Sequence, residues 1–148
     1  MRFQISTKVK GQTREVFAAF DKSLLSRLVP PGMRLKLIQF DEPTRVGGVV
    51  HIEVTMFGLI KQEWYNEITE YQEGDAECWF VDEGVRLPKM LKYWRHKHLI
   101  RAAGEGVEIV DDVTYEGRWK VLGWLLYLPI RLQFVMRKPT YRKVFGKI

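Results

Sequence analysis

The stretch YWRHKHLIRA-AGEG-VEIVDDVTYE, residues 93–116, decides the fold of this chain. Residues 93–102 and 107–116 each alternate with a period of two, the pattern of a strand with one buried and one solvated face. The segment AGEG between them carries two glycines and predicts a turn. The sequence therefore predicts an antiparallel β-hairpin, with Arg95, Lys97 and Arg101 on its outer, solvated face.

The inner face of this hairpin combines aromatic, aliphatic and ionisable side chains. If Ala102 pairs with Val107, His98 lies opposite Asp111, and directly opposed Cβ atoms on neighbouring strands are about 5 Å apart. We therefore expect His98 and Asp111 to hydrogen-bond. The inner residues are Trp94, His96, His98 and Ile100 on the first strand and Ile109, Asp111, Val113 and Tyr115 on the second.

Three interpretations of these inner histidines and the aspartate remain open. The first is a structural pair, since a buried carboxylate needs a partner. The second is a polar anchor for the head group of a ligand. In the third, Asp111 orients His98 as a general base, or the group binds a metal ion. No third metal ligand is apparent, because His51 falls on an outer face, so the sequence predicts neither a metal nor a cofactor.

The rest of the chain fits one α+β domain over residues 1–148. Thr13 and Asp21 are the expected N-caps of two short helices, the second ending before Pro30-Pro31-Gly32. Short turns between successive strands favour an antiparallel meander. Alternating or strand-like runs predict further strands at 2–9, 33–40, 47–57, 61–71 and 75–82.

The C-terminal residues 122–148 change to helical spacing. Phe134 falls on the inner stripe of the expected helix. Pro129 is expected in the first turn, where its missing N–H costs nothing, and Pro139 is expected to kink the helix or begin a new one.

The net charge of +6 is concentrated at the C-terminal end. Residues 117–148 contain eight basic and no acidic residues, whereas residues 1–116 contain 16 basic and 18 acidic ones. This asymmetry fits either a solvated basic face or attraction to an anionic membrane surface. Nucleic acid is not expected as a partner, because no recognised binding motif accompanies the basic residues. The oligomeric state is left open.

Composition and motif content bound the location and the chemistry. A single cysteine, Cys78, rules out an intramolecular disulfide. The first seven residues alternate like a strand and lack the apolar core of a signal peptide, and no stretch approaches the roughly 18 apolar residues of a transmembrane helix. The expected location is therefore the cytoplasm. The sequence also lacks phosphate-binding, dinucleotide-binding, Cys-x-x-Cys and Gly-x-Ser-x-Gly motifs, which excludes the enzyme classes built on them.

The order of these elements resembles that of a known superfamily. The pieces that carry the resemblance are Glu15-Val16-Phe17, Trp64-x-x-x-Ile68, Phe80-Val81-Asp82, Trp94-x-His96-x-His98 and Asp111-x-Val113-x-Tyr115. Over nearly its whole length the chain resembles the START-like, or SRPBCC, ligand-binding superfamily, and within it a polyketide cyclase/dehydratase-like bacterial subgroup. The segment Arg45-Val46-Gly47-Gly48 is shorter than the glycine-rich loop of the plant allergens in that superfamily.

This resemblance implies a helix-grip fold and a hydrophobic cavity. The fold has a strongly curved antiparallel sheet of about seven strands, two short helices after the first strand, and a long C-terminal helix across the concave face. The cavity would hold a hydrophobic small molecule such as a lipid, an isoprenoid or a polyketide. The superfamily contains both binders and enzymes, so membership does not choose between them.

The leading hypothesis is a binding or carrier protein for an apolar molecule with one polar end. One alternative is a cyclase- or dehydratase-like enzyme that uses His98 as the base and Asp111 as its orienting group. A second is a membrane-peripheral protein that uses residues 122–128 and the basic C-terminal segment. The residues expected to line the cavity are Trp64, Ile68, Phe80, Asp82, Trp94, His96, His98, Asp111, Val113, Tyr115 and Phe134.

Overall fold

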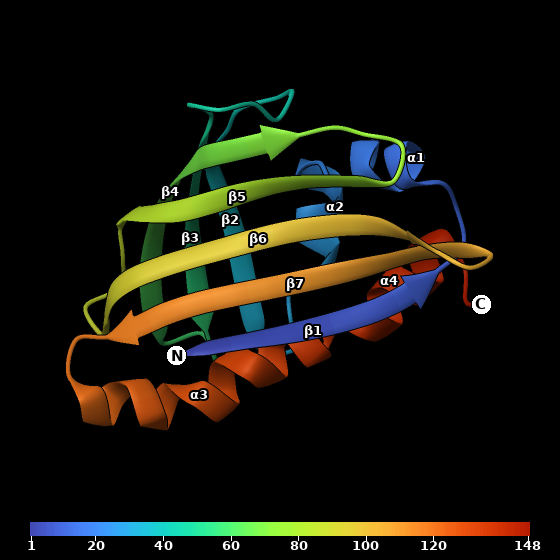
Figure 1. Ribbon diagram of the computed structural model, residues 1–148. Coiled ribbons are helices and arrows are strands. Elements are labelled where there is room, and N and C mark those ends of the chain that lie inside the picture. Colours follow the sequence, from blue (N-terminus) through green and yellow to red (C-terminus); the bar gives the residue numbers. More distant parts are fainter.

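Seven antiparallel strands form one sheet in the order β1-β7-β6-β5-β4-β3-β2 (Figure 1). Strands β2 to β7 follow one another as a meander, and β1 pairs with β7 at the edge of the sheet. The computed structural model describes residues 1–148. Its strands are β1 (Arg2–Val9), β2 (Met33–Phe40), β3 (Val49–Met56), β4 (Ile60–Gln72), β5 (Glu77–Arg86), β6 (Leu91–Ala103) and β7 (Gly106–Gly117).

Two short helices follow the first strand, as the sequence predicts. They are α1 (Thr13–Ala18) and α2 (Lys22–Arg27). Asp21 caps α2, because its Oδ1 accepts a hydrogen bond from the Leu24 amide at 2.9 Å. The N-cap of α1 is Gln12 rather than the expected Thr13, which is the first helical residue and is buried.

The C-terminal helix is broken into α3 (Lys120–Val135) and α4 (Arg137–Phe145) at Met136. Pro139 lies in the first turn of α4, which confirms that it accompanies a new helix. The expectation for Pro129 was wrong, since α3 begins earlier and places it in the helix interior. Pro129 lacks the N–H that would bond the carbonyl of Leu125, four residues earlier. Both side chains are exposed, so water can reach that carbonyl.

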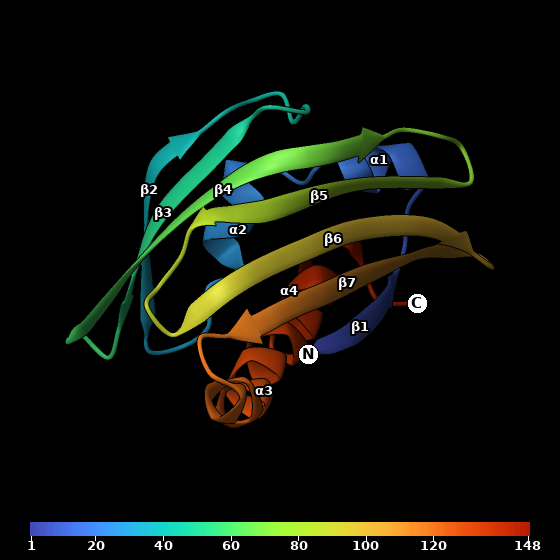
Figure 2. The ribbon, with the colours of Figure 1, turned by 60° about the vertical axis from the view of Figure 1, so that its left-hand side comes forward.

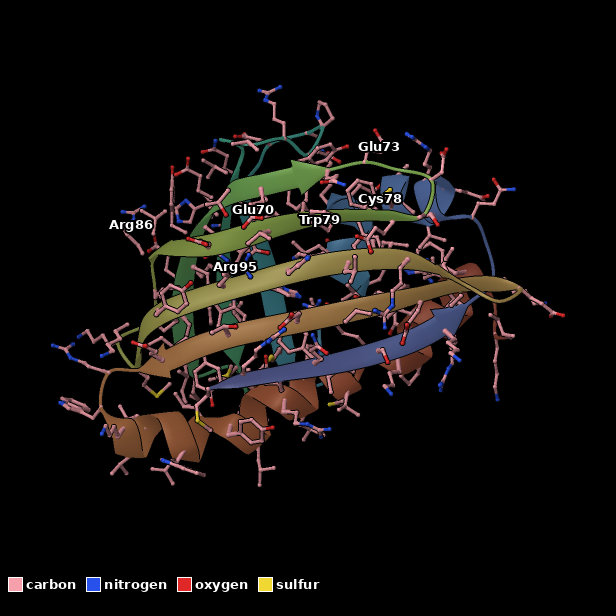
Figure 3. The ribbon with its side chains drawn as sticks, viewed as in Figure 1. Glu70, Glu73, Cys78, Trp79, Arg86 and Arg95 are labelled. Carbon is pink, nitrogen blue, oxygen red and sulfur yellow. The ribbon has the colours of Figure 1, made fainter.

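The predicted hairpin register is confirmed. Ala102 pairs with Val107, His98 with Asp111, and Trp94 with Tyr115. The inner face of β6 is buried and its outer face carries the charges. Figure 3 views that outer face, where Arg95 donates to Glu70 at 2.8 Å and Lys97 lies over the Trp79 ring.

The sheet is curved, with the helices on its concave side (Figure 2). Two separate apolar clusters fill that side. One lies beneath α1, α2 and α4 and includes Phe80, Ile100, Ile109 and Tyr141. The other lies beneath α3 and includes Trp94, Val113, Tyr115, Ile130 and Phe134. Between them, the same strands carry the ionisable residues Asp82, His96, His98 and Asp111. The predicted α+β helix-grip architecture is therefore present, and a polar layer divides its core.

Candidate functional site

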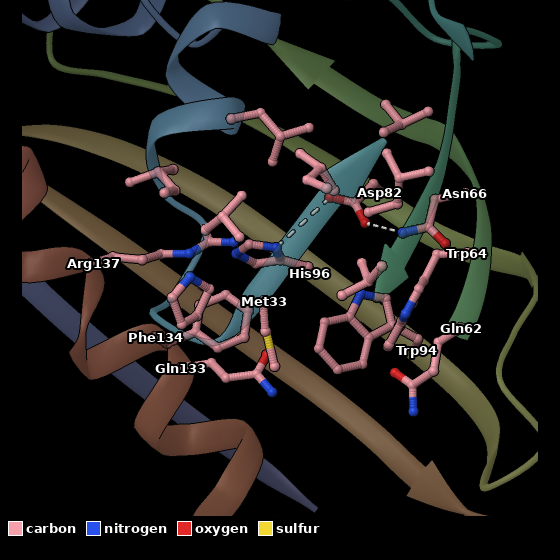
Figure 4. Close-up of a pocket in the computed structure, with 18 of the residues that line it drawn as sticks. Met33, Gln62, Trp64, Asn66, Asp82, Trp94, His96, Gln133, Phe134 and Arg137 are labelled. Carbon is pink, nitrogen blue, oxygen red and sulfur yellow. Dashed lines mark hydrogen bonds and ion pairs between the residues drawn. The ribbon is translucent and has the colours of Figure 1, made fainter. Parts of the chain in front are cut away.

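A cavity lies between the concave face of the sheet, the residues around α2, and the junction of α3 with α4. Its larger chamber has a volume of about 180 Å³, and a smaller one of about 70 Å³ adjoins it. An apolar cavity of about 150 Å³ accommodates a benzene molecule, so the larger chamber has room for about one ring. The wall of the larger chamber, drawn in Figure 4, includes Met33, Val50, Ile52, Trp64, Asn66, Asp82, Trp94, His96, His98, Phe134 and Arg137.

The polar end of the cavity consists of two hydrogen-bonded groups, which approach one another where His96 Nδ1 lies 3.8 Å from Asp82 Oδ2. Asn66 Nδ2 donates to Asp82 Oδ1 at 2.9 Å (Figure 4), and His98 Nε2 lies 2.6 Å from Asp82 Oδ2. His96 Nε2 lies 2.8 Å from Asp111 Oδ1. Behind this pair, Arg137 and the Tyr141 hydroxyl of α4 both donate to Asp111 at 3.3 Å. The cluster thus ties β4, β5, β6 and β7 to the C-terminal helix.

The expected hydrogen bond between His98 and Asp111 is wrong, although their register is right. Each histidine bonds a carboxylate that lies diagonally across the sheet, and diagonal neighbours are within reach of long side chains. The His98 ring instead stacks on Phe80, its direct neighbour in β5, with ring centroids 4.1 Å apart. A general base made of His98 oriented by Asp111 therefore has no geometric support.

Burial and neighbouring charges set the protonation of the cluster. Burial opposes ionisation of Asp111, but the charge of Arg137 and the hydrogen bond from His96 outweigh it and lower its pKa to about 2. For Asp82 too, burial alone would raise the pKa, but the hydrogen bonds from His98 and Asn66 and the charges of the two histidines together lower it. Burial and the neighbouring His96 lower the pKa of His98 to about 4. At neutral pH both carboxylates are therefore charged and His98 is neutral.

Two buried acceptors of the cluster have no hydrogen-bond partner, namely Asn66 Oδ1 and His98 Nδ1. Neutral His98 carries its proton on Nε2, where it faces Asp82, so its Nδ1 is an acceptor. A buried acceptor without a donor costs about 1–3 kcal/mol. Both residues line the larger chamber, which gives a bound molecule two points to fill with N–H or O–H groups.

The predicted cavity residues fall into three groups. Ile68 and Phe80 line the smaller chamber. Asp111 lies behind His96, while Val113 and Tyr115 are fully buried in the apolar cluster beneath α3. The remaining six line the larger chamber, and they are Trp64, Asp82, Trp94, His96, His98 and Phe134.

Arg137 and Asn66 are the functional candidates absent from the predicted set. Arg137 follows Phe134 by three residues, the spacing that places two side chains on one face of a helix, but its charge was assigned to the basic surface. Asn66 lies between Trp64 and Ile68 on the same face of β4, so alternation alone would have included it.

No family model and no curated protein matches the sequence. Solved structures match its fold. The Zhui aromatase/cyclase from Streptomyces sp. R1128 superposes with a TM-score of 0.70 at 10% identity, covering 100% of this chain and 99% of that one. Protein Ms6760 from Mycobacterium smegmatis gives 0.65 at 18% identity, covering 91% and 84%. Ara h 8.0201 gives 0.60 at 13% identity, covering 95% and 96%. At these identities the likeness concerns the fold.

Proposed function

On the premise that the chain has the helix-grip fold of the START-like superfamily, we propose that it binds or carries a hydrophobic small molecule with one polar end. The observation that supports this is a chamber with tryptophan, phenylalanine and aliphatic walls that ends at unsatisfied buried acceptors. Apolar lining with a few placed polar groups is the usual composition of a small-molecule site. A lipid, isoprenoid or polyketide-like compound fits that description.

The size of the chamber limits how much of the ligand can be enclosed. About one ring fits beside Trp64 and Trp94, whose rings meet edge to face at 4.9 Å. A longer molecule would extend beyond this chamber. The enclosed end would carry a hydroxyl or N–H group directed at Asn66 Oδ1 or His98 Nδ1.

We expect phenol to bind more tightly than anisole, which has the same ring but no donor. The difference should be about fivefold to tenfold, the value of one hydrogen bond of roughly 1 kcal/mol. Isothermal titration calorimetry in the presence of a chelator measures it. Trp94→Ala should lower the affinity for both probes. Trp79→Ala, on the outer face, is the matched control and should leave both affinities unchanged. Equal affinity for the two probes, or equal losses in the two variants, would contradict the proposal.

A second candidate function is peripheral contact with an anionic membrane, and the outer face of α3 favours it. Five large apolar side chains there are 57–73% exposed, at the spacing of one helical stripe: Val121, Trp124, Leu125, Leu128 and Leu132. The opposite face of α3 is buried on the sheet, so this helix is apolar on two sides. A helix of a water-exposed surface normally keeps its outer face polar.

The charges around this stripe match an anionic lipid surface. Arg118, Lys120 and Arg131 are exposed beside it, and residues 117–148 contain no acidic side chain. Apolar residues with tryptophan, flanked by basic residues, are typical of helices that lie in the membrane interface. No helix in this chain has the length and apolar character needed to cross a membrane.

We expect the chain to co-sediment with phosphatidylcholine vesicles that contain phosphatidylserine, and less so at high salt. The double change Trp124→Glu and Leu128→Glu should reduce binding at least tenfold, since each apolar side chain contributes about 1.5–3 kcal/mol when buried. Val46→Glu, at an exposed residue remote from α3 in the sequence, is the control. A dimer in solution that the double change dissociates, without vesicle binding, would identify the stripe as a contact between copies instead.

A further inference from the structure

Three side chains at the polar end of the cavity bring metal-ligating atoms together. They are Asp82 of β5 and His96 and His98 of β6, and one ligand atom from each lies within 4.8 Å of the other two. Asp82 Oδ2 is 2.6 Å from His98 Nε2 and 3.8 Å from His96 Nδ1. We propose that these three atoms bind a divalent transition-metal ion, such as Zn²⁺, in a site with three protein ligands.

The separations suit such an ion after small side-chain movements. A tetrahedral ion with bonds of about 2.1 Å places its ligand atoms roughly 3.4 Å apart, and the two Asp82 distances bracket that value. Two imidazole nitrogens and one carboxylate oxygen form a donor set that Zn²⁺ and its neighbours in the first transition row accept. Asp82 is the third ligand that sequence spacing did not reveal, because it reaches the histidines from the next strand.

The surroundings of His96 match those of a metal-binding histidine. Its Nε2 is held by Asp111 at 2.8 Å, which leaves Nδ1 for the ion beside Asp82. Asp111 is fixed in turn by Arg137 and Tyr141. A carboxylate that orients a histidine from behind is the common support of such ligands, and it sets the tautomer that coordinates.

The two buried carboxylates differ in how their charges are balanced. Asp111 forms an ion pair with Arg137, whereas the hydrogen-bond and ion-pair partners of Asp82 are Asn66 and the two histidines, with no lysine or arginine among them. Buried carboxylates are normally paired or coordinate metals. A cation between Asp82 and the histidines would balance the second charge.

The proton balance of coordination is simple. Coordination of His98 through Nε2 moves its proton to Nδ1, so this atom changes from an acceptor to a donor. The three ligand residues also line the larger chamber, which leaves a coordination position open toward it. An oxygen atom at the polar end of a bound molecule would occupy that position. This last point rests on the proposed ligand-binding function, whereas metal binding itself does not.

The test uses the full chain, stripped of metal with a chelator and then dialysed. We expect one Co²⁺ per chain to give the visible absorption of a protein-bound ion, and Zn²⁺ to displace it in one-to-one titrations. His98→Gln and Asp82→Asn should each weaken binding at least a hundredfold. Asp111→Asn, which removes only the supporting carboxylate, should weaken it about tenfold to a hundredfold.

His51→Gln is the matched control, because His51 is the one other histidine and pairs with Glu63 on the sheet between β3 and β4. It should bind metal like the parent chain. Circular dichroism shows whether each variant is folded, and either ligand variant alone suffices for the comparison. The absence of saturable one-to-one binding to the parent chain would overturn the proposal, as would an equal loss in His51→Gln. Phenol binding in the presence of a chelator would survive that result, so failure of the metal site and failure of the ligand site are distinguishable.

Discussion

Deletion of residues 129–148 is expected to abolish cooperative folding. The segment supplies Ile130 and Phe134, which are buried in the cluster beneath α3, and Tyr141, which is buried in the other cluster. At about 1.5–3 kcal/mol for each large buried side chain, their loss approaches the 5–15 kcal/mol that stabilises a typical domain. The truncation also exposes Asp111 and the concave face of the sheet to water. Thermal unfolding followed by circular dichroism should show no cooperative transition.

A shorter truncation provides the control for this experiment. Deletion of Lys147 and Ile148 removes one isolated bridge between Lys147 and Val9 and leaves α3 and α4 intact. That chain should unfold cooperatively, within a few degrees of the full-length protein. Similar cooperative melting after removal of residues 129–148 would mean that the helices are an appendage of the sheet.

The change Arg137→Met is expected to destabilise the protein by about 3–5 kcal/mol. It leaves the Asp111 carboxylate buried, 2% exposed, without its cationic partner, and removal of one member of a buried pair carries a cost of this size. Methionine keeps most of the length and the apolar stem, so lost packing contributes little. Urea unfolding at neutral pH, with a chelator present, measures the difference.

The double variant Arg137→Met with Asp111→Asn separates lost charge balance from lost contacts. It should be more stable than Arg137→Met alone, because the neutral amide no longer needs a cation. Arg131→Met, at an exposed position of α3, is the control and should change stability by less than about 0.5 kcal/mol. A double variant that is less stable than Arg137→Met by the full cost of Asp111→Asn would show that the two residues act independently.

The hairpin register was predictable because two signals agree. Charged side chains assign the outer face of both strands, and the turn between Ala102 and Val107 fixes which residues oppose one another. A slip by one residue would bury Lys97 and expose His98, so parity alone excludes it. The strand order of the meander follows from short turns by the same local reasoning.

The partners within the polar cluster were not predictable from this register. Alternation assigns a face, but His98 and His96 each have a direct and a diagonal carboxylate within reach, and packing chooses between them. Here the His98 ring stacks on Phe80, its direct neighbour in β5. Arg137 and Tyr141 belong to α4, which is remote in sequence, and both donate hydrogen bonds to Asp111. The helix break was predictable in kind, since Pro139 in the first turn of α4 indicates where a new helix begins.

The polar layer between the two apolar clusters also bears on how strand slippage is prevented. A slip of β7 along β6 by two residues would keep every side chain on its original face, so the hydrophobic pattern opposes it only weakly. Such a slip would carry Asp111 about 7 Å along the strand, away from Arg137 and Tyr141. It would leave a buried charge without partners, at a cost of several kcal/mol. The ionisable residues thereby select one alignment among those that the apolar residues alone would tolerate.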